Sequence, residues 1–289
     1  MKLVTAIESM AKERDELRRA GKRVGFVPTM GALHAGHESL VRRARSECDF
    51  VVASVFVNPL QFGAGEDFSR YPRDLEGDRA KLAACGCDLL FTTTPGAMYP
   101  HGFQTYVVPD GPLVARYEAS ARPGHFRGVA TVVLKLLHLV GPDRAYFGRK
   151  DAQQSAVVRR MVADLNAPVA IVVAPTVREA DGLAMSSRNA YLSPAERAAA
   201  PAIHRALASA RERAKAGERD PARLLAAIDA DLRAIPGGSA EYVALVDPDT
   251  FEERAARLPE RLPPTLAVTA VRLGATRLLD NLRLDEDGP

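Results

Sequence analysis

The sequence predicts an α/β fold in which helices cover both faces of a parallel sheet, followed by a smaller C-terminal α+β domain. Short apolar runs alternate with helical stretches over about the first 175 residues, which is typical of parallel sheets. From about residue 177, Ala- and Arg-rich helical stretches precede β-rich segments. A chain of 289 residues can form two unequal domains, and we place them at 1–176 and 177–289.

The strand predictions depend on apolar runs that end at turn residues. Residues 24–28 stop at Pro28-Thr29, and residues 50–57 stop at Asn58-Pro59. Three more strands are predicted at 88–92, 144–147 and 169–174, with helices at 36–48, 74–84, 129–140 and 153–165. The second domain is predicted to contain helices at 194–216 and 221–235 and strands at 242–246, 265–273 and 276–281.

Composition excludes several classes of protein. Apolar residues make up 47% and charged residues 26% of the chain, as in ordinary globular enzymes. The net charge of +3 is spread along the sequence, so a nucleic-acid partner is not indicated. The N-terminus lacks a signal peptide's apolar core, and no run is long enough to cross a membrane. We therefore expect a cytoplasmic protein whose three cysteines are reduced thiols.

A histidine pair follows the first predicted strand. Residues 28–37 read PTMGALHAGH, which places His34 and His37 at the start of a helix. Both imidazoles then lie on one face at the helix N-terminus, which favours anions. The pair could merely cap the helix, but it resembles the HxGH signature of nucleotidyl transferases and class I synthetases. We predict that it binds nucleotide phosphates.

A second polar segment, GRKDAQQ at residues 148–154, follows another predicted strand. The compact ammonium of Lys150 suits a polyphosphate, and the amides of Gln153 and Gln154 can bind an acid or a hydroxyl group. Taken alone, the segment is better explained as an exposed turn with a local Lys–Asp pair.

Two further segments carry candidate ligand-binding groups. In MSSR at residues 185–188, two hydroxyls and a guanidinium could bind phosphate oxygens, although a plain polar loop fits equally well. The mobile turn Asp181-Gly182 is expected just before it.

In FVNPLQFG at residues 56–63, the amides of Asn58 and Gln61 follow a strand. The next residues, 63–78, are either a closing lid or a solvated connection.

Together these segments resemble the pantothenate synthetase family, also called pantoate–β-alanine ligase. The similar blocks, in chain order, are PTMGALHAGH, FVNPLQFG, YPR, RPGHFRGVATVV, FG-x-KD-x-QQ and TVREADGLAMSSRN. They cover roughly residues 24–192, and the remaining third of the chain resembles the family only in its general character, without matching blocks.

The resemblance implies a Rossmann-like nucleotide domain, a smaller domain that closes over it, and a homodimer. It implies condensation of pantoate with β-alanine through a pantoyl-adenylate, with ATP as cofactor and Mg²⁺ carried mainly by the ATP phosphates. Carried over position by position, the ATP-binding residues are Met30, Gly31, Ala32, Leu33, His34, Ala35, Gly36, His37, Gly148, Arg149, Lys150, Asp151, Val177, Met185, Ser186, Ser187 and Arg188. The substrate-binding residues are Asn58, Gln61 and Gln154. The catalytic residues are His37, His34, Lys150, Ser186, Ser187 and Arg188.

Three positions depart from the family pattern. Arg149 stands where an acidic residue is usual, Ala152 replaces an aromatic residue, and residues 117–119 read Tyr-Glu-Ala in place of Leu-Glu-Gly. An inward-facing Arg149 would add positive charge to the nucleotide site. We expect Lys150 to face inward and Arg149 outward.

Two other functions compete with a ligase. A nucleotidyl transferase of the same superfamily would release diphosphate but keep the nucleotidyl product. A non-catalytic nucleotide-binding module would give the His, Lys, Ser and Arg donors no role. Formation of AMP that depends on β-alanine distinguishes the three.

Overall fold

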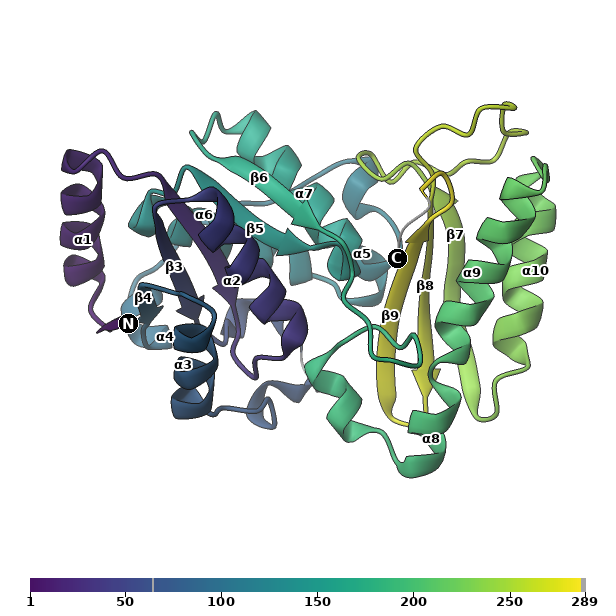
Figure 1. The fold of residues 1–289 in the computed structure, drawn as a ribbon, viewed down its shortest axis with the longest axis horizontal. Helices are drawn as coiled ribbons and strands as arrows, with labels where there is room; N and C mark the ends of the chain where they lie inside the picture. Colours follow the sequence, from purple (N-terminus) through teal and green to yellow (C-terminus); the bar gives the residue numbers. More distant parts are fainter. Residues whose placement is uncertain (64, 287–289) are drawn as a thin grey trace. The chain divides into compact units, whose positions relative to one another are not determined.

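A computed structural model describes residues 1–63 and 65–286 (Figure 1). The chain divides into two compact units. Unit 1 consists of Met1–Gly148 and Val157–Ala174, and unit 2 consists of Arg149–Ala156 and Pro175–Pro289. The segment at residues 149–156 thus belongs to the same unit as the C-terminal part of the chain. Closure of a small domain over a large one stays a prediction.

Unit 1 contains a six-stranded parallel sheet, which confirms the predicted fold class. Its strands are β1 (Lys2–Val4), β2 (Val24–Thr29), β3 (Phe50–Val55), β4 (Leu89–Thr92), β5 (Arg144–Gly148) and β6 (Ala170–Ala174). The spatial order β1-β4-β3-β2-β5-β6 reverses direction between β2 and β5. In open parallel sheets, ligands bind outside the carboxyl ends of the strands at such a reversal.

Strand β1 is missing from the five predicted strands. It is three residues long, pairs only with β4 at the sheet edge, and has one buried residue. A single buried residue produces no alternating pattern, so the sequence does not indicate this strand.

Helices cover both faces of this sheet. Alternate residues of β4 point to opposite faces: Leu89 and Phe91 join one core cluster, and Leu90 joins another. Helices α1, α6 and α7 pack in the first cluster, whereas α2 and α3 pack in the second. The helices are α1 (Ile7–Arg19), α2 (Ala35–Glu47), α3 (Leu75–Ala84), α4 (Pro95–Met98), α5 (Glu118–Ala121), α6 (His125–Val140) and α7 (Ala152–Asp164).

Unit 2 has a three-stranded antiparallel sheet with helices on it, which agrees with the predicted α+β character (Figure 1). Its elements are α8 (Pro194–Ala199), α9 (Ala202–Lys215), α10 (Pro221–Arg233), β7 (Gly238–Val246), β8 (Leu266–Leu273) and β9 (Thr276–Arg283). The single helix predicted at 194–216 is wrong, because it is divided into α8 and α9 at Pro201. Proline has no N–H with which to continue the helical hydrogen bonds.

The three cysteines are buried and form no disulfide in the structure, as expected of reduced thiols. Burial raises the pKa of Cys85 and raises that of Cys87 to about 11. Both thiols therefore stay protonated near neutral pH and are poor nucleophiles. In the described part of the chain, we find no helix with the length and apolar character needed to cross a membrane.

Candidate active site

The two histidines stand at the junction of β2 and α2. His34 is the N-cap of α2, and its Nδ1 accepts a hydrogen bond from the Gly36 N–H at 3.2 Å. His37 Nδ1 accepts from the His34 N–H at 3.4 Å, which completes a reciprocal capping box. The two ring centroids are 4.1 Å apart. The structure therefore brings the pair together at a helix N-terminus.

This arrangement fixes the chemistry of both rings. Because each Nδ1 accepts an N–H bond, the proton of each neutral imidazole is on Nε2. The Nε2–H groups are donors at the positive end of the helix dipole. Capping and anion binding are therefore compatible, since they use different ring nitrogens.

Helix α3 fixes the turn that precedes the histidines. Asp78, which is 1% exposed, accepts hydrogen bonds from the Leu33 N–H at 2.7 Å and the Ala32 N–H at 2.9 Å. Lys81 Nζ donates to the Leu33 carbonyl at 2.7 Å. Gly31 has a φ of 86°, and a Cβ there would lie 2.8 Å from Asp78 Oδ2. Asp78 and Lys81 are not among the predicted site residues, because nothing in the sequence indicates which loop they bind.

Asn58 makes hydrogen bonds with all four of its amide positions. Its Nδ2 donates to Gln61 Oε1 at 3.0 Å and to the Gly128 carbonyl at 3.1 Å. Its Oδ1 accepts from the Tyr99 hydroxyl at 2.7 Å and the Leu60 N–H at 3.3 Å. The side chain is 1% exposed. These contacts suit a residue that orients Gln61 better than one that binds substrate directly.

Gln61 lines one of two hollows of unit 1 and contacts Met30, which lines the other. Its Nε2 lies 2.9 Å from the Met30 sulfur, so two residues of the predicted site are in contact. One hollow of about 210 Å³ is lined by Met30, Gly31 and the ends of β3 and β4. The other, of about 220 Å³, is lined by Gln61, Glu66, Arg122 and His125. Both volumes suit small molecules rather than a whole nucleotide.

Arg122 and His125 fix the backbone of Gln61. His125 Nδ1 donates to the Gln61 carbonyl at 2.9 Å, and its Nε2 accepts from Arg122 at 3.1 Å. Arg122 also donates to the Gln61 carbonyl at 3.1 Å and forms a bidentate pair with Glu66 at 2.7 and 2.8 Å. Glu66 thus ties the start of the 63–78 segment to this site. The lid function of that segment stays a prediction.

The environment of His125 predicts a loss of stability in acid. Burial, together with the charge of Arg122, lowers the pKa of His125 from 6.5 to about 4. An unfolded chain takes up the proton at a higher pH than the folded chain, so stability is complete above pH 6.5 and falls as the pH decreases toward 4. The loss from this group should total about 3 kcal/mol. Denaturant unfolding at pH 7 and pH 4.5 measures it.

The control for this pH dependence is the variant His125→Asn, because its amide does not titrate and still offers a hydrogen-bond donor. We expect its free energy of unfolding to decrease less between the two pH values than that of the wild type. Equal decreases in both proteins would show that His125 does not carry this pH dependence.

In unit 2, the 149–151 turn presents two cations with different partners. Arg149 donates to Glu286 at 2.6 Å. Lys150, whose side chain is 19% exposed, lies with its Nζ 3.6 Å from Asp151 Oδ1. The Lys–Asp pair considered for this turn is therefore present, and Lys150 is half-buried. Gln154 follows on α7 and is also partly buried.

The segment that contains Val177 and the two serines forms a narrow hairpin. Met185 N–H donates to the Val177 carbonyl at 3.0 Å, and Arg178 pairs with Ala184 as an antiparallel bridge. Ser186 Oγ accepts from the Arg188 N–H at 3.2 Å and so begins the short helix Ser187–Tyr191. At the hairpin tip, Asp181 pairs with Arg197 at 2.6 Å. The predicted turn is present, with its carboxylate paired.

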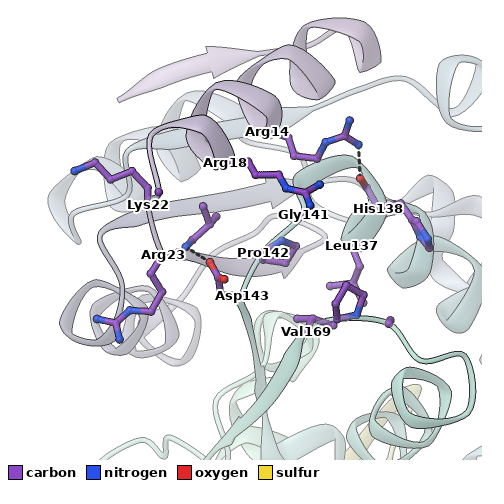
Figure 2. A pocket seen from close by; sticks show the side chains of 14 residues that line it. Arg14, Arg18, Lys22, Arg23, Leu137, His138, Gly141, Pro142, Asp143 and Val169 are labelled. Carbon is purple, nitrogen blue, oxygen red and sulfur yellow. Dashed lines mark hydrogen bonds between the residues drawn. The ribbon is translucent and has the colours of Figure 1, made fainter.

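A third hollow, of about 780 Å³, lies beside the amino ends of β2, β5 and β6 (Figure 2). Arg14 and Arg18 project from α1 toward the end of α6, where Arg14 donates to the His138 carbonyl at 2.9 Å. Helices α1 and α6 both end here, and cations are favoured at helix C-termini. The helix ends account for these charges, so we assign no substrate to this hollow.

Comparisons with known proteins identify the family of this chain. The family profile described as pantoate-beta-alanine ligase matches residues 2–283. A pantothenate synthetase from Heliobacterium modesticaldum is 52% identical over 282 residues, covering 98% of this chain and 99% of the relative. One from Thermus thermophilus is 54% identical over 278 residues, covering 96% of this chain and 98% of the relative.

Solved structures give the same result. The crystal structure of a pantothenate synthetase from Thermus thermophilus aligns with a TM-score of 0.92 and 52% identity, over 99% of this chain and 100% of that one. A pantoate-beta-alanine ligase from Francisella tularensis, complexed with beta-gamma ATP and beta-alanine, aligns with a TM-score of 0.79 and 32% identity, over 99% of this chain and 98% of that one. This chain therefore belongs to the pantoate–β-alanine ligase family.

Proposed function

We propose that this ATP-dependent pantoate–β-alanine ligase activates its acid as a pantoyl-adenylate. A pantoate carboxylate oxygen attacks the α-phosphorus of ATP, and the bond to the β-phosphate oxygen breaks to release diphosphate. The amine nitrogen of β-alanine then attacks the acyl carbon, loses a proton and displaces AMP. The product is pantothenate, from which coenzyme A is built.

The observation that carries this proposal is the pair of Nε2–H donors at the start of α2. Negative charge develops on the diphosphate as it leaves. Donors that are already oriented toward this charge stabilise the transition state without reorganising. His37, and with it His34, is therefore assigned to the phosphates, and His37 can donate a proton to the leaving group.

The remaining nucleotide contacts are assigned by residue type. Lys150, Ser186, Ser187 and Arg188 provide an ammonium, two hydroxyls and a guanidinium for phosphate oxygens. The rest of the ATP-binding set supplies mainly backbone and apolar contacts, with a carboxylate from Asp151. This set comprises Met30, Gly31, Ala32, Leu33, Ala35, Gly36, Gly148, Arg149, Asp151, Val177 and Met185.

The substrate contacts are assigned to amides. Gln61 and Gln154 would bind the hydroxyl and carboxylate groups of pantoate, because an amide both donates and accepts. Gln61 would also contact β-alanine. Asn58 would act on pantoate through Gln61, since its own four hydrogen-bonding positions contact protein groups.

Magnesium would reach the enzyme on the phosphates of ATP. Mg²⁺ is usually held by substrate phosphates and one or two carboxylates, and its charge offsets the charge of diphosphate. The Asp151 carboxylate, 46% exposed beside Lys150, is a suitable protein ligand. We also propose a homodimer in the cytoplasm and closure of the smaller domain over the larger, as the family resemblance implies.

One assay separates this function from its rivals. Purified protein is mixed with ATP, Mg²⁺ and pantoate, and diphosphate and AMP are measured with and without β-alanine. We expect diphosphate release to require pantoate, and multiple-turnover AMP formation to require β-alanine. Steady diphosphate release with no effect of β-alanine would indicate a nucleotidyl transferase. Nucleotide binding without release of either product would indicate a binding module.

A further inference from the structure

We propose that Asn281, on strand β9, is the residue that positions Lys150. Its Nδ2 donates to the backbone carbonyls of Arg149 and Lys150, both at 2.9 Å. The side chain is 4% exposed. This inference rests on the proposed role of Lys150 at the ATP phosphates and adds a residue from a part of the chain that contains none of the predicted site residues.

The amide of asparagine is well suited to this contact. Both atoms that face it are carbonyl oxygens, so a group with two N–H donors is required, and an NH₂ group provides them from one atom. The 149–151 turn is a three-residue 3₁₀ helix, a structure with poor internal hydrogen-bond geometry. Two bonds from a neighbouring strand therefore restrict its backbone, and with it the direction of the Lys150 side chain.

The strand that carries Asn281 is itself fixed by a buried ion pair. Arg178 donates to both carboxylate oxygens of Asp280, at 2.7 and 2.9 Å, and the two side chains are 7% and 3% exposed. Arg178 also donates to the Asn281 carbonyl at 3.2 Å. Because Arg178 begins the hairpin that leads to Ser186, this pair connects the hairpin with the Asn281 backbone.

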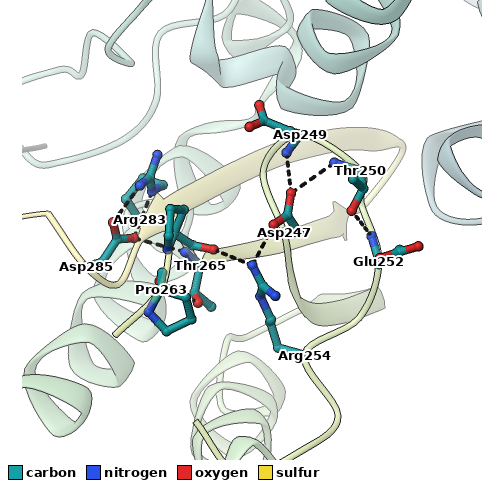
Figure 3. A network of polar contacts seen from close by, with 10 residues as sticks. Asp247, Asp249, Thr250, Glu252, Arg254, Pro263, Thr265, Arg283 and Asp285 are labelled. Atoms are coloured by element: carbon teal, nitrogen blue, oxygen red, sulfur yellow. Dashed lines mark hydrogen bonds and ion pairs between the residues drawn. The ribbon is translucent and has the colours of Figure 1, made fainter. Parts of the chain in front are cut away.

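The end of β9 provides a second connection to the same turn. Figure 3 shows Arg283 paired with Asp285, which accepts from the Thr265 N–H at 3.0 Å. Arg283 also lies 3.2 Å from Glu286, and Glu286 in turn accepts from Arg149 at 2.6 Å. The backbone of the turn is thus bound by Asn281, and its first side chain is bound by Glu286.

The test is a double-mutant cycle of Asn281→Ala and Lys150→Ala, read as pantoate-dependent diphosphate release. We expect Asn281→Ala to lower kcat by about 10- to 100-fold, the usual effect of misplacing a catalytic group, with a smaller change in KM for ATP. In the Lys150→Ala background, the same change should have almost no effect, because Asn281 acts through Lys150. A merely structural role would lower the rate by the same factor in both backgrounds.

Two further variants make the test specific. Asn281→Asp keeps the shape but turns a carboxylate toward two carbonyls, so it should be at least as slow as Asn281→Ala. Thr269→Val is the control, because Thr269 is buried in the same sheet and donates to the Tyr242 carbonyl at 2.8 Å. It should lose comparable stability and keep its rate.

Four results would be decisive. Equal rates for wild type and Asn281→Ala, or equal losses in both backgrounds of the cycle, would overturn the role of Asn281. Equal rates for wild type and Lys150→Ala would instead show that the role proposed for Lys150 is wrong. A wild-type protein that releases no diphosphate with pantoate would refute the proposed function, and this inference with it.

Discussion

Replacing His37 or His34 by alanine should lower the rate of diphosphate release by about 10² to 10³-fold, the usual effect of removing one oriented donor from a transition state. The reason is that each ring uses Nδ1 to cap α2, so its Nε2–H is the group assigned to the phosphates. Stopped-flow or single-turnover measurement with saturating ATP and pantoate isolates this step.

The control must separate catalysis from capping. His34→Asn keeps a side-chain acceptor at the N-cap, where asparagine is among the best residues, whereas His34→Ala loses about 1 kcal/mol of helix stability. We expect the Asn variant to unfold like the wild type and to be as slow as the Ala variant. Wild-type rates in both variants would mean that the histidines only cap the helix.

The residues found from the sequence share one property: each lies just after a predicted strand or within a short polar motif. His34, Gln61 and Lys150 all follow apolar runs, and the carboxyl ends of parallel strands are where ligands bind. Position along the chain therefore makes them candidates, and the family resemblance is what assigns them to the site. Their roles in catalysis stay predictions that the experiments above address.

The residues that position the site could not be found in this way. Asp78 binds the turn before His34 from helix α3, and Asn281 binds the Lys150 turn across more than a hundred residues. Such pairs are formed by the tertiary fold, and a single sequence contains no periodic or spacing signal for them. The same limit explains why Asn58 could be read as a substrate ligand, since its partners Tyr99 and Gly128 are far away in the chain.

The fold is easier to predict from the sequence than these contacts, because each central strand is an apolar run that ends in a turn. Strands and helix ends are predicted wrongly where that pattern is weak. Strand β1 has one buried residue, and helix α6 begins at His125, four residues before the predicted apolar run, with Gly124 at a φ of 82° as its N-cap. Element type follows from periodicity, whereas exact ends depend on caps and tertiary contacts.

Substitutions at Lys150 should lower the adenylation rate strongly, whereas a substitution at its neighbour Arg149 should not. Lys150→Ala should lower adenylation by about 10² to 10³-fold, and Lys150→Arg should also lose much of the rate, because a planar fork does not replace a point charge. Arg149→Glu, which restores the usual acidic residue, should change the rate by less than about tenfold. Its side chain pairs with Glu286 at 2.6 Å, and partly exposed charges are screened by salt.

The charge at position 149 can be tested independently of the catalytic step. Arg149→Glu alone places two carboxylates side by side and should cost some stability. The double variant Arg149→Glu with Glu286→Arg should regain part of it by reversing the pair, but not all, because Glu286 also pairs with Arg283 at 3.2 Å. Adenylation rates at low and moderate salt complete the comparison, since a contact between Arg149 and ATP would make the rate of the variant depend strongly on salt.

If Arg149→Glu abolishes the reaction and Lys150→Ala leaves it intact, then Arg149 is the phosphate ligand. The turn that Asn281 orients would then serve a different cation from the one assigned here.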